Sequence, residues 1–131
     1  MKVNALEFVN YRNLSDNRIE PAEKVNVIYG LNAQGKTNLL EAVWLFSGGH
    51  SFRGSKDSEF INFSKNNARL FMSFFAGNRD QKAEIIYQGS KKEVIINGVK
   101  KSSAAFLSQH FSSVVFSPEH LTLIKNGPSL R

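Results

Sequence analysis

The chain has 131 residues, of which 41% are hydrophobic and 21% charged. This composition is typical of a globular domain and excludes a disordered protein of low hydrophobicity. The absence of cysteine excludes a disulfide framework and thiolate metal sites. No apolar run approaches the roughly 20 residues of a membrane helix, and no secretory signal follows Met1, so we expect a cytoplasmic protein without membrane partners.

The formal net charge is +6, and the basic excess lies entirely in the second part of the chain. Residues 1–50 carry five basic and five acidic side chains, whereas residues 51–131 carry twelve and six. A basic excess is typical of proteins that bind nucleic acid or another polyanion. A lysine-rich solvated surface gives the same composition, so charge alone leaves both interpretations open.

The first part of the sequence predicts three strands and a helix. Alternating apolar residues predict a strand at 2–9 and a shorter one at 14–19, and the apolar run 25–29 indicates a buried strand. Residues 36–46 have the clearest helical pattern, which Gly48-Gly49 ends. Because this helix has almost no polar face, we expect it to be buried on nearly all sides.

The second part predicts a β meander at about 69–101. Its strands are expected at 70–75, 83–87 and 93–96, and Asn97-Gly98 is a strong signal for a hairpin that brings the chain back. Shorter elements are predicted around it: a helix near 57–62, a helix at 102–109 capped by Ser102 or Ser103, a strand at 113–116, and a helix from Pro118 to about Lys125. The sequence stops at Arg131 without a closing element, so we expect a truncated protein.

Residues 30–37 carry the chemistry of the chain. They read GLNAQGKT and match the phosphate-binding pattern G-x-x-x-x-G-K-[ST] between a predicted strand and a predicted helix. Gly30 and Gly35 let the backbone turn tightly and approach phosphate oxygens, while successive N–H groups face the anion at the helix N-terminus. Lys36 is expected to reach the β and γ phosphates, and the Thr37 hydroxyl to be one Mg²⁺ ligand. The expected ATP-binding residues of this segment are Gly30, Leu31, Asn32, Ala33, Gln34, Gly35, Lys36, Thr37 and Asn38, the last of which could instead support the helix start.

The loop alone does not decide between classes of P-loop protein. The GTPase strings D-x-x-G and N-K-x-D are both absent. No acidic residue directly follows an apolar strand, where hydrolysis needs one to hold Mg²⁺ or orient water, because Glu84 and Glu93 precede their apolar runs. We therefore assign no catalytic residue and expect the chain not to turn over ATP alone.

Several segments together resemble the N-terminal part of the RecF family, bacterial DNA replication and repair proteins of the ABC/SMC-like ATPase class. The opening residues 6–13 are similar to the family's L-x-N-F-R-N start, and residues 30–53 to G-x-N-x-Q-G-K-T-N-L-L-E-A-I. Similar segments at 95–98, 115–121 and 125–129 follow in the family's order, so the resemblance covers nearly the whole chain.

The resemblance implies an α/β fold, namely lobe I of an ABC-type ATPase head with an antiparallel β meander. Lobe II, the arm domain, the signature motif and the Walker B carboxylates would lie beyond Arg131. The family's heads dimerise with ATP between them, bind DNA at gaps and at junctions of single- and double-stranded DNA, and with RecR and RecO promote RecA loading in recombinational repair and the SOS response. A full-length protein of this kind would be a weak, DNA-stimulated ATPase. Ser117-Pro118-Glu119 stand where transporter-type heads place a Gln, which leaves open the residue that senses the γ-phosphate.

By similarity to related heads, Arg12 is expected to contact the nucleotide, with a solvated turn arginine as the alternative. Arg53 is a weaker candidate for a DNA or nucleotide contact. Lysines 91, 92, 100 and 101 bracket the predicted hairpin and suit either DNA phosphates or protection of a sheet edge. Two alternatives from other classes remain open: a small P-loop kinase, which the few scattered arginines disfavour, and a folded but nucleotide-free structural lobe.

Overall fold

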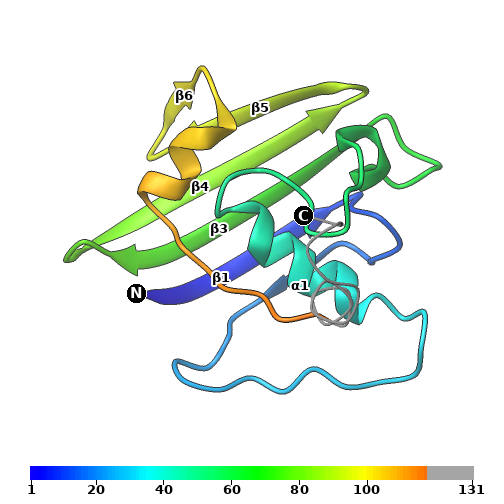
Figure 1. Cartoon of the computed structure of the whole chain (residues 1–131), viewed down its shortest axis with the longest axis horizontal. Coiled ribbons are helices and arrows are strands. Elements are labelled where there is room, and N and C mark those ends of the chain that lie inside the picture. Colours follow the sequence, from blue (N-terminus) through cyan, green and yellow to red (C-terminus); the bar gives the residue numbers. More distant parts are fainter. Residues whose placement is uncertain (118–131) are drawn as a thin grey trace, which may run out of the picture.

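The computed structural model describes residues 1–117. Six antiparallel strands form one sheet in the order β2-β1-β3-β4-β5-β6, with α1 lying across it (Figure 1). The elements in chain order are β1 (Lys2–Val9), β2 (Asn17–Ile19), α1 (Lys36–Leu45), the 3-10 helix η1 (Asp57–Phe60), β3 (Asn67–Ala76), β4 (Arg79–Gln88), β5 (Lys91–Ile96), β6 (Val99–Lys101) and the 3-10 helix η2 (Ala104–Gln109).

The meander is confirmed as strands β3 to β6, with longer strands than predicted. Alternate residues of β3 and β4 face the core in matched pairs, for example Leu70 opposite Ile85 and Met72 opposite Ala83. The Asn97-Gly98 hairpin is also confirmed, with φ of 50° and 80°, the left-handed pair that a two-residue turn requires. Strand β1 completes the layer by pairing with β3, so the first predicted strand lies in the middle of the sheet.

Helix α1 packs one side against the sheet, where Ala42, Leu45 and the following Phe46 join the core. The prediction that this helix is buried on nearly all sides is wrong, because Leu40 is 49% exposed. Only one sheet face is available to cover the helix within residues 1–117, so its opposite side stays in solvent. Its single carboxylate, Glu41, is fully buried.

The predicted strand at 25–29 is not formed. The segment joins no ladder, and Val25, Val27 and Tyr29 are 76%, 77% and 88% exposed. A strand is stabilised by hydrogen bonds to a neighbouring strand. Within the described part of the chain no strand pairs with this segment, so its apolar residues find no partner.

The shorter elements agree in part with the predictions. The predicted strand at 14–19 is shortened to β2, and the helices near 57–62 and 102–109 are the 3-10 turns η1 and η2. Ser103 caps η2 by accepting a hydrogen bond from the backbone N–H of Ala105, as expected. The strand predicted at 113–116 is wrong, because no strand among residues 1–117 pairs with this segment, and Val114 and Phe116 are largely exposed. The helix predicted from Pro118 lies outside the described residues.

Candidate nucleotide-binding site

The P-loop, residues 30–37, lies between the segment 25–29 and α1, and its conformation depends on its two glycines. Gly30 and Gly35 have φ of 153° and 94°, and a side chain at Gly35 would bring its Cβ to only 2.4 Å from Cδ2 of Leu14. Ala33 also adopts a left-handed φ of 63°. The loop therefore turns its backbone as an anion nest requires, and Gly35 is the position with least room for a substitution.

The N-terminus of α1 carries no group that would compete with an anion. Its first turn has no acidic residue, and no side chain caps its N–H groups. These N–H groups have no partner within the helix and carry the positive end of the helix dipole. A phosphate bound at this turn would meet both the free donors and the dipole.

Lys36 already lies over the P-loop. Its Nζ donates to the backbone oxygens of Gly30 at 2.7 Å and Leu31 at 2.5 Å. The ammonium group is thus held above the turn, where a phosphate oxygen would exchange for one of these carbonyls. Thr37 is exposed on the first turn of α1, so its hydroxyl is accessible from solvent.

Asn13, in the turn after β1, supports the P-loop and was not assigned a role from the sequence. Its amide donates to the backbone oxygen of Ala33 at 3.3 Å, and its own side-chain oxygen accepts from Asn38 at 2.6 Å. The contact ties Asn38, in the first turn of α1, to the turn after β1, and the role of Asn38 in binding nucleotide remains a prediction. Asn13 is the last residue of segment 6–13, which resembles the start of RecF family sequences. That resemblance was the signal available for Asn13 in the sequence.

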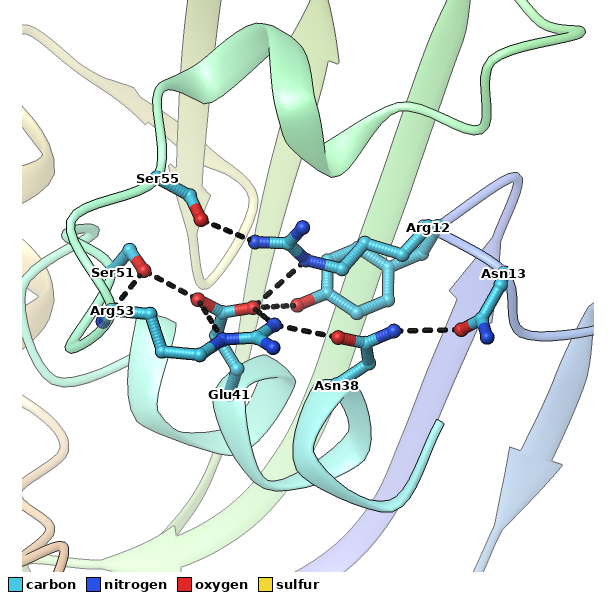
Figure 2. Close-up of polar contacts among 8 residues, drawn as sticks. Arg12, Asn13, Asn38, Glu41, Ser51, Arg53 and Ser55 are labelled. Atoms are coloured by element: carbon cyan, nitrogen blue, oxygen red, sulfur yellow. Dashed lines mark hydrogen bonds and ion pairs between the residues drawn. The ribbon is translucent and has the colours of Figure 1, made fainter. Parts of the chain in front are cut away.

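The predicted residues Arg12, Asn38 and Arg53 come together around Glu41, one helical turn into α1 (Figure 2). Arg53 Nη2 contacts Glu41 Oε2 and Asn38 Oδ1, both at 2.5 Å. Arg12 Nε forms an ion pair with the same Glu41 oxygen at 2.8 Å, although its angle does not suit a hydrogen bond. Hydroxyl groups complete the cluster: Ser51 and Tyr11 donate to Glu41, and Arg12 donates to Ser55.

The electrostatics of the cluster keep its carboxylate ionised. Burial on its own would raise the pKa of Glu41, but the hydrogen bonds from Arg53 and Ser51 and the charge of Arg12 together hold that pKa below its ordinary value. Burial, and then the charge of Glu41, raise the pKa of Tyr11, so its hydroxyl stays protonated as a donor. The cluster therefore combines two guanidinium groups with one carboxylate and keeps a net positive charge beside the helix start.

The backbone of Arg12 is held in a strained conformation. Its φ is 48°, a left-handed value that is uncommon for a long side chain. Both of its backbone polar groups are fixed, since its N–H donates to Phe60 at 2.9 Å and its C=O accepts from Asn62 at 2.7 Å. The guanidinium group also lies over the Phe60 ring, 5.0 Å from its centre. Backbone strain of this kind, of the order of 1–3 kcal/mol, persists where the surroundings over-determine it.

The four lysines near the hairpin, Lys91, Lys92, Lys100 and Lys101, line one surface hollow. Three of them have partners within the chain: Lys92 contacts the backbone oxygen of Gly49 and the carboxylate of Asp57, Lys100 pairs with Glu93, and Lys101 lies over the Phe106 ring. These partners neutralise or cover part of the charge that the sequence suggested for DNA. A DNA contact at this edge remains a prediction.

Among residues 1–117, no group of three or more His, Asp or Glu side chains could hold a metal ion, and no helix is long and apolar enough to span a membrane.

Comparisons with known proteins agree with the resemblance seen in the sequence. The sequence model of the AAA domain family matches residues 5–124. The DNA replication and repair protein RecF of Thermoanaerobacter sp. (strain X514) is 45% identical over 132 residues, which cover 100% of this chain and 36% of that protein. RecF of Clostridioides difficile (strain 630) is 39% identical over 131 residues, 100% of this chain and 35% of that protein.

Comparison with solved structures shows that the fold is also similar to that of RecF. "Structure of the recombination mediator protein RecF-ATP in RecFOR pathway" matches with a TM-score of 0.86 and 43% identity, covering 97% of this chain and 36% of that one. The corresponding RecF-ATPrS structure matches with a TM-score of 0.90 and 42% identity, covering 98% of this chain and 35% of that one. The similarity to the N-terminal part of RecF and the P-loop fold class are thus confirmed, and the chain spans about a third of the length of these relatives.

Proposed function

Because the chain belongs to the AAA domain family, we propose that it binds ATP through residues 30–38, in a protein of recombinational DNA repair. The observation that carries the proposal is the left-handed turn of the P-loop beside an uncapped helix N-terminus, with Lys36 held above it. This arrangement offers backbone donors, a dipole and an ammonium group to one anion. Relatives that are similar in sequence and fold include a RecF structure described as RecF-ATP.

Each part of the site has a proposed role. The backbone N–H groups of residues 30–37 would hold the β and γ phosphates, and Lys36 would leave its carbonyl partners for their oxygens. Thr37 would supply one oxygen to Mg²⁺, which offsets phosphate charge when bound. Asn38 and Arg12 would act at the rim of this site, Asn38 by holding the loop and Arg12 by its charge.

For the whole protein we propose the function of its RecF relatives. ATP would hold two such heads together, and the dimer would bind DNA at gaps and junctions and promote RecA loading with RecR and RecO in recombinational repair and the SOS response. The relatives support this through their names, which describe a DNA replication and repair protein and a recombination mediator in the RecFOR pathway. The DNA contacts, the dimer, the ATPase activity and a cytoplasmic location are parts of the proposal.

A second candidate is a folded lobe that binds no nucleotide on its own. The observation that favours it is the unpaired segment 25–29, which leads directly into the P-loop and is exposed along its length. Without a neighbouring strand among the described residues, the entry to the loop depends on local contacts, such as those between Asn26 and Ala22, and on the contact of Asn13 with Ala33. A small P-loop kinase has no such support from the structure.

Calorimetric titration of the chain with Mg·ATP tests the proposal. We expect saturable binding that Lys36→Ala abolishes, because the substitution removes the ammonium group from the phosphate site. Lys65→Ala, an exposed lysine on the loop before β3, is the matched control and should bind as the unaltered chain does. Absence of binding by the unaltered chain would reject ATP binding by this chain and favour the nucleotide-free lobe.

A further inference from the structure

The buried carboxylate of Glu41 has no role in the nucleotide site described above, yet it joins three segments that are distant in sequence. It belongs to α1, whose first turn forms the phosphate end of the site, and it contacts Arg12 from the turn after β1 and Arg53 from the loop after α1 (Figure 2). The carboxylate is fully buried, whereas the side chains of Arg12 and Arg53 are 15% and 28% exposed. The acidic centre is thus enclosed while the two cations lie nearer the surface.

We propose that Glu41 is a positioning residue for nucleotide binding, which fixes the guanidinium groups of Arg12 and Arg53 beside the phosphate end of α1. The inference rests on the proposed function, because it assumes that phosphates occupy the P-loop. It adds a residue that acts through two others and does not itself touch the nucleotide.

The contacts of Arg53 link Glu41 to the P-loop. One nitrogen, Nη2, contacts both Glu41 and Asn38, which lie three residues apart on the same face of α1. Asn38 directly follows Thr37 and is bonded to Asn13, which holds the backbone of the P-loop at Ala33. A continuous chain of side-chain contacts therefore joins the guanidinium group of Arg53 to the loop that would hold phosphate.

The contacts of Arg12 restrain its guanidinium group. Its Nε contacts the same Glu41 oxygen, while its Nη2 donates to Ser55 at 2.7 Å. The left-handed backbone and the Phe60 ring hold the side chain from the other side. Contacts at both ends of the guanidinium group leave it little freedom to rotate. Less side-chain entropy would therefore be lost when the group later contacts a phosphate.

Charge explains why a carboxylate is suited to this position. Two guanidinium groups against one side of a helix repel each other, and a shared carboxylate between them offsets that repulsion. The cluster retains one net positive charge, which attracts phosphate. A neutral side chain of the same shape would leave the two cations unbalanced and free to move apart.

The test compares Glu41→Gln with the unaltered chain in Mg·ATP titrations. We expect affinity to fall about tenfold, within the range of couplings between contacting residues. In a background that carries Arg12→Gln and Arg53→Gln, which removes both guanidinium groups and their charges, Glu41→Gln should change affinity less than about twofold. Glu93→Gln, at a half-buried carboxylate paired with Lys100 between β5 and β6, is the matched control and should leave affinity unchanged.

A nitrogen-15 NMR measurement on the unaltered chain keeps the proposal testable if a variant does not fold. The Nε–H signals of Arg12 and Arg53 should exchange slowly with water, because Arg12 Nε is buried beside Glu41 and Arg53 Nε donates to Glu41, and both should shift when Mg·ATP is added. Rapidly exchanging signals, or an equal loss of affinity from Glu41→Gln in both backgrounds, would overturn the inference while leaving ATP binding intact. Failure of the unaltered chain to bind Mg·ATP would instead overturn the proposed function, and the inference with it.

Discussion

Asn38 donates a hydrogen bond to the side-chain oxygen of Asn13 at 2.6 Å, which ties the residue after the P-loop to the turn after β1. Asn13 in turn donates to the backbone oxygen of Ala33 inside the loop. The left-handed turn at Ala33 is therefore braced by a side chain from the turn that follows a central strand of the sheet. Through this contact the antiparallel layer helps to fix the shape of the nucleotide loop.

Replacing Asn13 with alanine removes both contacts and should loosen the P-loop without disturbing the core. We expect Mg·ATP affinity to fall by about three- to tenfold, the cost of roughly one hydrogen bond. Calorimetry of Asn13→Ala measures this loss, with Asn66→Ala, an exposed position before β3, as the control. Equal affinities of the two variants would contradict the bracing role.

Gly35 should be the least replaceable residue of the loop. Alanine there combines a φ of 94° with a Cβ 2.4 Å from Leu14 Cδ2, so we expect Gly35→Ala to lower the free energy of unfolding by about 1–3 kcal/mol. At Gly54 φ is 75° and nothing lies within 4 Å of the new Cβ, so Gly54→Ala isolates the backbone strain, about 1–2 kcal/mol. Urea unfolding of both variants gives the difference, and a smaller loss at Gly35 than at Gly54 would show that the contact with Leu14 is absent.

Glu41 should contribute to stability in a pH-dependent way. Its pKa is lower in the folded protein than the ordinary value of about 4.3, so its contribution is complete above that value and is lost as pH falls through the folded pKa. Glu41→Gln should therefore lower the free energy of unfolding by about 3–5 kcal/mol near pH 7. At about pH 3 the loss should be smaller, because the native carboxylate is then closer to protonation.

Urea unfolding at several pH values measures this difference, with Glu93→Gln as a control that lacks a buried carboxylate. A difference between Glu41→Gln and the unaltered chain that grows as pH falls would contradict the lowered pKa of Glu41.

The unpaired segment 25–29 should cause the isolated chain to self-associate. Val25, Val27 and Tyr29 expose apolar side chains along an unpaired backbone, which is a known template for association. We expect Val27→Lys to shift sedimentation toward the monomer. Phe63→Lys, at a lone residue that is 99% exposed, should have no such effect, and equal behaviour of the two variants would contradict a role for the segment.

The meander and the P-loop could be predicted because their signals are local. Alternating apolar residues and the Asn97-Gly98 pair determine strands and turns between neighbours in sequence. The segment 25–29 has an equally clear strand pattern, but a pattern predicts a strand only if another strand pairs with it, and none does so among residues 1–117. The same reason explains the missing strand at 113–116.

The polar cluster was predicted only in part. Arg12, Asn38 and Arg53 were candidates by resemblance, whereas Glu41, which joins Arg12 and Arg53, went unassigned. Its signal was available as the one charged residue within the apolar run that follows Asn38. Ser51 and Ser55 gave no signal, because a serine in a polar loop acquires a partner only through tertiary structure.

Backbone NMR of the chain titrated with Mg·ATP tests the central claim most directly. If residues 30–38 form a phosphate site, their amide signals should shift first and most, with those of the first turn of α1 among them, and Lys36→Ala should abolish the shifts. Shifts confined to other residues, such as the lysines of β5 and β6, or no shifts at saturating Mg·ATP, would contradict a nucleotide site at the P-loop of this chain.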